Sequence, residues 1–312
     1  MNRTERNKKA NRKKLLLILV LLLLCLAAAA FILLHEAKPG NSDAEEPAEE
    51  TPAAEEMTEE DEEAAEEIAA EDAEAIATGK AASHVYSHRG SAGDDELTIA
   101  AYDRAIEAGS IYIEADIVVS QDGTVFLAHD DNSLEMTGYD AYFSGMTDGQ
   151  IAELKTKAGN EIIKLSDLFD KYGDSATYLV DIKYTGQRNI DAFAEIVRKY
   201  ELEDNVMAVS SYFDALSPIE GYFPGMKQLI VCPDQETFDT ALWKENIDIL
   251  CVPKEIMTED NLKEAHAHGK LFSAWTLNTE EEIKKAIELG VDTYFTDDSG
   301  LAIKLEKELR AE

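Results

Sequence analysis

The chain has 312 residues, with 64 acidic against 29 basic side chains and a formal net charge of -35. Such an acidic protein repels the phosphate backbone, which excludes a nucleic-acid partner held by charge neutralisation. Positive charge is concentrated at the start, where residues 1–14 form a basic tail with seven Lys and Arg side chains.

An uncharged apolar run from Leu15 to Leu34 follows the basic tail. As a helix it is long enough to cross a hydrocarbon core of about 30 Å. A basic flank before an apolar span places the N-terminus in the cytoplasm and the rest of the chain outside. We therefore expect residues 15–34 to be a single-pass signal anchor in the cytoplasmic membrane, with the folded part extracytoplasmic. The alternative is a cleaved signal peptide, which the small residues of "LAAAAF" allow and which would make the protein secreted.

The segment from residue 35 to residue 82 consists mainly of Ala, Glu, Asp, Pro and Thr, with almost no large apolar side chain. It cannot bury enough surface to offset the entropy cost of ordering. We expect a disordered, self-repelling acidic linker here.

Residues 83–312 are enough for one large domain. Eight short runs of β-forming residues alternate with stretches that carry apolar residues at helical spacing. The runs are Val85–Ser87, Ile111–Val118, Thr177–Ile182, Val206–Ser210, Gln228–Val231, Ile247–Val252, Leu271–Trp275 and Thr293–Thr296. Eight strands, most of them followed by a helix, predict an α/β fold, the (β/α)8 TIM barrel.

Two of these strands place carboxylates inside the predicted barrel. In "IYIEADIV" the apolar positions suit the helix layer, which directs Glu114 and Asp116 inward. In "TYLVDIKY" the same alternation directs Asp181 and Lys183 inward. Because an unpaired buried carboxylate costs several kcal/mol or loses its charge, a cluster of three acids indicates a bound cation.

The stretch "IVVSQDGTVFLAHD" is too short for a crossover helix, and its Asp122-Gly123 pair predicts a β-hairpin excursion after the second strand. With that pair as a two-residue turn, His129 lies opposite Asp116 on the same face. A three-residue loop over Gln121 to Gly123 would shift the register by one and could turn His129 away. We expect the first register, because it brings His129 to the carboxylates.

His88 and Arg89 follow the first strand directly, at the carboxyl end where barrel enzymes carry their sites. Acid-only ligands select one hard divalent cation, Ca²⁺ or Mg²⁺, over zinc. Such a cation beside an arginine, a lysine and two imidazoles suits a phosphate ester. The positive groups take the developing charge, while one imidazole acts as base and the other as acid.

Seven segments together resemble the glycerophosphodiester phosphodiesterase family, which has a phospholipase C-like phosphodiesterase barrel. They are "SHRG", "DELTIAAYDRAIEAG", "IEADIVVSQDG", "LAHDDNSLEMTG", "LVDIKY", "VSSYF" and "FSAWTLNTEEEIKKAIELGVDTYFTDD". The resemblance runs from about Ser83 to Ser299. It implies the (β/α)8 barrel with a hairpin, and cleavage of glycerophosphodiesters to glycerol 3-phosphate and an alcohol.

The resemblance also implies roles for single residues. His88 and His129 would be the acid-base pair, and Arg89 and Lys183 would contact the phosphate. The metal ligands would be Glu114, Asp116 and Asp181; Trp275 would form an aromatic wall for the glycerol or headgroup, and Glu96 would support the arginine.

Two departures from the family pattern stand out: "PEN" before the first helix is "DEL" here, and Asp181 replaces a longer glutamate.

By analogy with related barrels, the glycerol 2-hydroxyl would attack phosphorus to give a cyclic intermediate.

The leading hypothesis is a membrane-anchored, metal-dependent phosphodiesterase. A phospholipase acting on lysolipids or phosphatidylinositol would need an apolar or aromatic rim at the mouth, for which the loop Gly138–Met146 is the candidate. A catalytically degenerate barrel that binds a phosphoryl ligand is the third hypothesis. Both histidines, Glu114 and Asp116 argue against it, and the substitution at Asp181 argues for it.

Overall fold

The computed structural model describes residues 84–91, 93 and 95–310. The expected basic tail, signal anchor and acidic linker lie outside these residues. Among the helices that are described, none is both long and apolar enough to cross a membrane.

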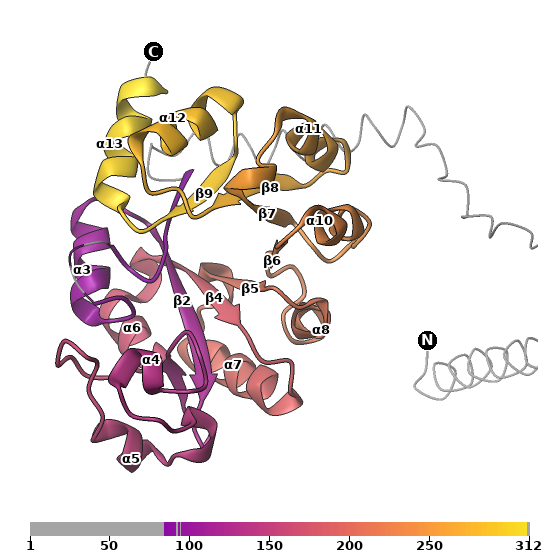
Figure 1. Cartoon of the computed structure of the whole chain (residues 1–312). Coiled ribbons are helices and arrows are strands. Elements are labelled where there is room, and N and C mark those ends of the chain that lie inside the picture. The colour runs from indigo at the N-terminus through magenta and orange to yellow at the C-terminus, as the bar shows by residue number, and fades with distance from the viewer. Residues whose placement is uncertain (1–83, 92, 94, 311–312) are drawn as a thin grey trace, which may run out of the picture. The chain divides into compact units, whose positions relative to one another are not determined.

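Eight parallel strands form a closed barrel (Figure 1). They are β1 (Val85–Ser87), β2 (Tyr112–Val119), β4 (Thr177–Ile182), β5 (Val206–Ser210), β6 (Gln228–Val231), β7 (Ile249–Pro253), β8 (Leu271–Trp275) and β9 (Thr293–Thr296). Neighbouring strands follow chain order, and β1 pairs with both β9 and β2, which closes the barrel. The predicted TIM barrel is confirmed.

Helices cover the outside of the barrel (Figure 1). They are α3 (Ile99–Glu107), α6 (Leu165–Tyr172), α7 (Gln187–Tyr200), α8 (Phe213–Leu216), α9 (Ile219–Tyr222), α10 (Gln235–Leu242), α11 (Glu259–Ala267), α12 (Glu280–Leu289) and α13 (Ser299–Leu309). Three short 3₁₀ turns, η3 (Gly173–Ser175), η4 (Glu203–Asn205) and η5 (Lys254–Ile256), lie in the connections. The starts of α3, α11 and α12 are fixed by Thr98, Thr258 and Thr279, whose side chains accept a hydrogen bond from an amide of the first turn.

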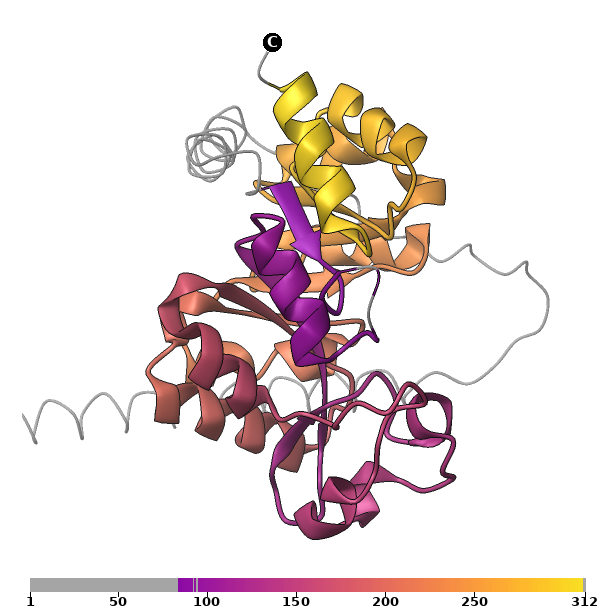
Figure 2. The same cartoon turned by 90° about the vertical axis from the view of Figure 1, so that its left-hand side faces the viewer.

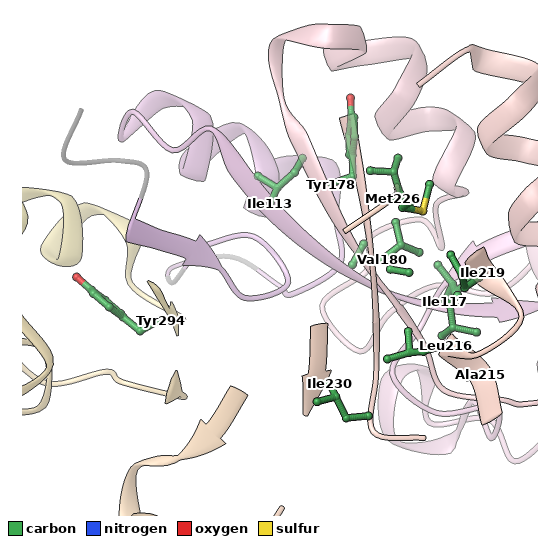
Figure 3. Close-up of a cluster of buried hydrophobic side chains, with 14 of the residues drawn as sticks. Ile113, Ile117, Tyr178, Val180, Ala215, Leu216, Ile219, Met226, Ile230 and Tyr294 are labelled. Carbon is green, nitrogen blue, oxygen red and sulfur yellow. The ribbon is translucent and has the colours of Figure 1, made fainter. Parts of the chain in front are cut away.

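The alternation of side chains along the strands divides the core in two. Ile113, Ile117 and Val180 point outward and pack against the helices (Figure 3). Tyr86 and Leu179 point inward and belong to a separate cluster within the barrel. Because neighbouring residues alternate, the acids of β2 and β4 face inward, as predicted.

The predicted hairpin is present, but the predicted register is wrong by one residue. The strand β3 (Val125–Leu127) pairs antiparallel with β2, with Val119 opposite Val125. The backbone N–H of Ser120 donates to the carbonyl of Thr124 at 2.9 Å, so the loop has three residues, Gln121 to Gly123.

The side chain of Asp148 explains this longer loop. Its two carboxylate oxygens accept hydrogen bonds from the Ser120 hydroxyl at 2.6 Å and the Thr124 hydroxyl at 2.5 Å, which holds these two residues opposite each other. Gly123 has φ +93°, which suits the last position of a three-residue hairpin loop. His129 is not turned away, because β3 ends at Leu127 and strand alternation no longer sets the direction of its side chain.

Three short helices follow the hairpin: α4 (Leu134–Thr137), η2 (Phe143–Gly145) and α5 (Asp148–Ala152). This excursion is drawn in magenta at the lower end of the view in Figure 2. Phe126, Phe143, Ile151 and Ile162 form the centre of its own small apolar cluster. The excursion is therefore a packed unit beside the barrel mouth.

Candidate active site

Eight of the nine side chains predicted for the site line one cavity of about 220 Å³ at the carboxyl ends of the strands. They are His88, Arg89, Glu114, Asp116, His129, Asp181, Lys183 and Trp275. Glu96, the ninth, lines an adjacent cavity of about 250 Å³, which Arg89 and His129 also line. Closure of the barrel thus brings together residues that are far apart in the chain.

Three carboxylates lie together on adjacent strands. Asp116 on β2 is opposite Asp181 on β4 in the parallel register, and Glu114 lies two residues earlier on the same face. All three are buried: Glu114 is 3% exposed, Asp116 1% and Asp181 6%. One oxygen from each lies within 4.8 Å of the others.

Burial makes full ionisation of these carboxylates costly. Burial and the neighbouring Asp116 carboxylate raise the pKa of Glu114 well above its ordinary value. Burial, opposed by Lys183, raises the pKa of Asp181 to about 6. Burial also acts on Asp116, but Lys183 and Arg89 outweigh it and lower the pKa of that carboxyl. Full ionisation of the triad would therefore need more positive charge than the two cationic side chains supply.

Arg89 links three acids. Its Nε lies 2.7 Å from Asp116 Oδ2, and its Nη1 lies 3.1 Å from Glu96 Oε1. Its backbone N–H donates to Glu114 Oε2 at 3.0 Å. The expected contact between Glu96 and the arginine is present although "DEL" stands where the family has "PEN".

Lys183 bridges two of the triad carboxylates. Its Nζ lies 2.8 Å from Asp116 Oδ1 and 2.6 Å from Asp181 Oδ2. Burial alone would lower the pKa of Lys183, but these two acids outweigh it and raise that pKa. Lys183 therefore carries its charge inside the cavity.

The two imidazoles that line this cavity differ in their surroundings. The His88 side chain is 22% exposed, and its Nδ1 lies 2.7 Å from Asp297 Oδ1. The His129 side chain is 43% exposed, and its Nδ1 lies 3.2 Å from Oδ2 of the adjacent Asp130. Both rings have one nitrogen next to a carboxylate, which leaves the other nitrogen for a substrate.

One part of the cavity wall is apolar, formed by Val209, Val231, Trp275 and Phe295. Trp275 lies at the end of β8, and its buried indole Nε1 has no hydrogen-bond partner among the described residues. An aromatic ring with a donor at its edge suits the carbon skeleton and a hydroxyl of a polyol. Trp275 lines the cavity, and its role as a wall for the glycerol or headgroup stays a prediction.

Asp297 and Asn278 were not predicted from the sequence. Asp297 contacts His88, and Asn278 contacts Asp297 through both its amide nitrogen and its amide oxygen. The only available signal was that Asp297 follows β9 directly, at the end of the barrel where sites are found.

The triad fits a hard divalent cation by two observations. Its donors are carboxylate oxygens, the ligand type that calcium and magnesium prefer. In addition, Asp181 Oδ1 is buried and has no hydrogen-bond partner among the described residues. A cation held by Glu114, Asp116 and Asp181 would occupy this oxygen and offset the excess negative charge.

Comparison with known proteins identifies the family. The sequence profile of the Glycerophosphoryl diester phosphodiesterase family matches residues 88–301. A glycerophosphodiester phosphodiesterase of Caldanaerobacter subterraneus is 27% identical over 238 residues, covering 71% of this chain and 96% of the relative. A human lysophospholipase D is 25% identical over 267 residues, covering 68% of this chain and 82% of the relative.

A crystal structure of a glycerophosphodiester phosphodiesterase from Thermotoga maritima superposes with a TM-score of 0.61 at 28% identity, covering 71% of this chain and 97% of that chain. The family profile spans more than half of the sequence and nearly all of the barrel. The chain therefore belongs to the glycerophosphoryl diester phosphodiesterase family and is a phosphoric diester hydrolase of the phospholipase C-like barrel type.

Proposed function

We propose that this hydrolase cleaves glycerophosphodiesters by acid-base catalysis with His88 and His129, assisted by one divalent cation at the acidic triad. The observation that supports this most directly is the single cavity of about 220 Å³ lined by both imidazoles, both cationic side chains and all three buried acids. The same set disfavours the alternative of a degenerate barrel that only binds a phosphoryl ligand.

In this mechanism Arg89 and Lys183 bind the non-bridging phosphate oxygens; their charge and their position in the cavity wall support this role. One imidazole takes the proton of the glycerol 2-hydroxyl as its oxygen bonds to phosphorus. The other imidazole gives a proton to the departing alcohol as the old P–O bond breaks. Water then opens the cyclic phosphate with the two roles exchanged, which releases glycerol 3-phosphate.

A divalent cation bound by Glu114, Asp116 and Asp181 would supply Lewis-acid charge next to the phosphate. The side chains themselves do three things. Arg89 and Lys183 hold the phosphate. His88 and His129 act from opposite sides of it, and Trp275 shields the glycerol from water. Calcium and magnesium both fit the donors, and the short Asp181 side chain favours magnesium, which retains more of its own water.

The test is hydrolysis of glycerophosphocholine by the full chain in detergent, after chelation and after return of each metal. We expect chelation to abolish release of choline and glycerol 3-phosphate, and Mg²⁺ or Ca²⁺ to restore it. Full activity after complete chelation would rule out the role of the metal. Absence of activity with every glycerophosphodiester under all metal conditions would rule out the proposed substrate class.

A second candidate function is hydrolysis of lysolipids at a membrane surface. Four large side chains are exposed on this part of the surface: Leu134 (49%), Tyr139 (58%), Tyr142 (62%) and Tyr184 (37%). Three of them, Leu134, Tyr142 and Tyr184, line a groove of about 440 Å³. The groove also includes Asp130, the residue after His129, so it opens beside the site. The candidate loop Gly138–Met146 thus packs Phe143 inward and exposes two tyrosines.

This lysolipid activity has a direct test. Replacing Leu134 and Tyr142, which line the groove, by Ser should lower kcat/KM on lysophosphatidylcholine in vesicles but leave kcat/KM on glycerophosphocholine unchanged. An equal effect on both substrates would exclude an acyl-chain site in the groove.

We also propose that the chain is anchored in the cytoplasmic membrane with its barrel outside. The basic tail and the apolar run Leu15–Leu34 support this orientation. An anchored barrel would meet phosphodiesters released at, or attached to, the outer face of the membrane.

A further inference from the structure

One ring nitrogen of His88, Nδ1, has a defined hydrogen-bond partner. His88 Nδ1 lies 2.7 Å from Asp297 Oδ1. An ionised carboxylate accepts hydrogen bonds and donates none, so the ring proton must be on Nδ1. Burial raises the pKa of Asp297, but its hydrogen bonds with His88 and Asn278 outweigh this and keep the carboxyl ionised. The neutral ring is therefore held with its lone pair at Nε2, the form that a general base requires.

Asp297 is itself held in place by Asn278. The amide nitrogen of Asn278 donates to Asp297 Oδ2 at 2.6 Å, and its amide oxygen accepts from the backbone N–H of Asp297 at 2.9 Å. An amide side chain has the one donor and one acceptor that this double contact needs. Asn278 therefore fixes both the side chain and the backbone of Asp297.

These residues come from three neighbouring strands of the barrel. His88 follows β1, Asp297 follows β9, Asn278 lies after β8, and the sheet order places β9 between the other two. The backbone N–H of His88 also donates to the carbonyl of Thr296 at 3.0 Å. The main chain and the ring of His88 are thus both fixed against the end of β9.

Asp297 has no visible role in starting the helix that follows it. The N-cap of α13 is the next residue, Asp298, whose carboxylate accepts from the backbone N–H of Leu301 at 3.0 Å. The Asp297 side chain is 48% exposed, so it is not a core group. Its contacts are directed at His88 and Asn278, which indicates a role at the site rather than in folding.

We propose that Asp297, held by Asn278, is a positioning residue that fixes the tautomer of His88 and so makes Nε2 the proton acceptor. This inference rests on the two-histidine mechanism proposed above. As the attacking hydroxyl oxygen bonds to phosphorus, its proton moves to Nε2. The ring becomes an imidazolium, Asp297 stays ionised, and no second proton is transferred.

Asp297→Asn is the most informative variant. An asparagine at this position can turn its NH₂ toward Nδ1, which moves the ring proton to Nε2 and removes the acceptor. It also removes the negative charge that stabilises the imidazolium. We expect kcat on glycerophosphocholine to fall about 10²- to 10⁴-fold, with KM changed less than about threefold, because the phosphate contacts of Arg89 and Lys183 remain.

Two further variants control this result. Asp298→Asn removes one negative charge at the neighbouring position and keeps an N-cap residue, so its kcat should equal that of the parent. Asn278→Ala leaves Asp297 charged but unsupported, and we expect a smaller fall in kcat than for Asp297→Asn. Thermal unfolding of all variants would show that the barrel is intact.

Imidazole ¹⁵N NMR of the full chain in detergent reports the tautomer without any activity. The resonances of His88 are assigned by their loss in His88→Gln. We expect the Nδ1–H form of neutral His88 in the parent and the Nε2–H form in Asp297→Asn. An unchanged tautomer, or an Asp297→Asn protein with the parent's kcat, would overturn the inference. If the parent shows the Nδ1–H form but hydrolyses no glycerophosphodiester, the proposed substrate is wrong and the positioning of His88 still stands.

Discussion

Asp116 and Asp181 share one ammonium group, because Lys183 Nζ lies 2.8 Å from Asp116 Oδ1 and 2.6 Å from Asp181 Oδ2. The parallel register of β2 with β4 places the two aspartates opposite each other, and Lys183 follows two residues after the second. This pair, with Glu114, sets the charge balance of the site. Changes at Asp181 should therefore affect metal binding and catalysis together.

Asp181 is the proposed metal ligand that stands where the resemblance to the family implies a longer glutamate. Asp181→Asn removes one ligand charge, so we expect divalent affinity and kcat/KM on glycerophosphocholine to fall together. Asp181→Glu should preserve or tighten both, with calcium gaining more than magnesium, because a longer carboxylate adds a direct ligand and calcium takes more protein oxygens. Isothermal titration with each metal and steady-state kinetics measure both. Equal metal affinity in the parent and Asp181→Asn would show that Asp181 is not a ligand.

Both imidazoles should be needed for turnover but not for folding. His88→Ala and His129→Ala each remove one proton-transfer group, so we expect kcat to fall about 10²- to 10⁴-fold with Tm within a few degrees of the parent. His268→Ala, at the C-cap of α11 and not among the residues that line the cavity, is the control and should retain parental kcat. Full activity of His129→Ala would contradict the role that we assign to this residue.

Gly90 holds the turn that carries His88 and Arg89. It has φ +100°, and a Cβ added there would lie 2.6 Å from Ala101 Cβ and 2.7 Å from the Ala101 backbone carbon. Gly109 also has φ +100° but has nothing within 4 Å of the added Cβ. Gly109→Ala should cost about 1–2 kcal/mol of unfolding free energy, the cost of the backbone conformation alone. Gly90→Ala should cost about 1–3 kcal/mol more, through overpacking.

Urea unfolding of both glycine variants, followed by circular dichroism, measures this difference. Equal unfolding free energies would mean that α3 moves away from the turn without cost. In that case, the activity of Gly90→Ala would show whether the turn itself positions the site.

The contact between His266 and Asp292 should make stability depend on pH. His266 Nε2 lies 2.8 Å from Asp292 Oδ2, and this hydrogen bond, opposed by burial, raises the pKa of His266. Because the pKa of His266 is higher in the folded state, protonation of His266 stabilises the fold. This contribution to the unfolding free energy is complete below the unfolded pKa of about 6.5 and is lost as the pH rises through the folded pKa. We expect His266→Gln to reduce the unfolding free energy more at pH 6 than at pH 8.5. A pH-independent difference would exclude this linkage.

The orientation of the chain can be tested in cells. We expect the protein in the membrane fraction, with its barrel digested by protease added outside intact cells, because a basic tail precedes the apolar run Leu15–Leu34. A soluble mature form that begins near Phe31 would show cleavage and secretion instead.

The barrel and the inward acids could be predicted because both follow from local patterns. A barrel strand is buried on both faces, so period-two alternation on β2 and β4 assigns Glu114, Asp116 and Asp181 to the inside without any knowledge of distant contacts. The predicted strands agree with the observed ones to within two residues for the same reason.

Other features depend on contacts that no local pattern contains. The hairpin register was decided by the Asp148 carboxylate, which lies more than twenty residues beyond the turn and holds Ser120 opposite Thr124. The orientation of His88 was decided by Asp297, which is 209 positions away and becomes a neighbour only when β9 pairs with β1. The sequence by itself determined which side chains face the barrel interior. Only the tertiary structure decided which of them meet, because closure of the barrel sets distances between strand ends that are remote in the chain.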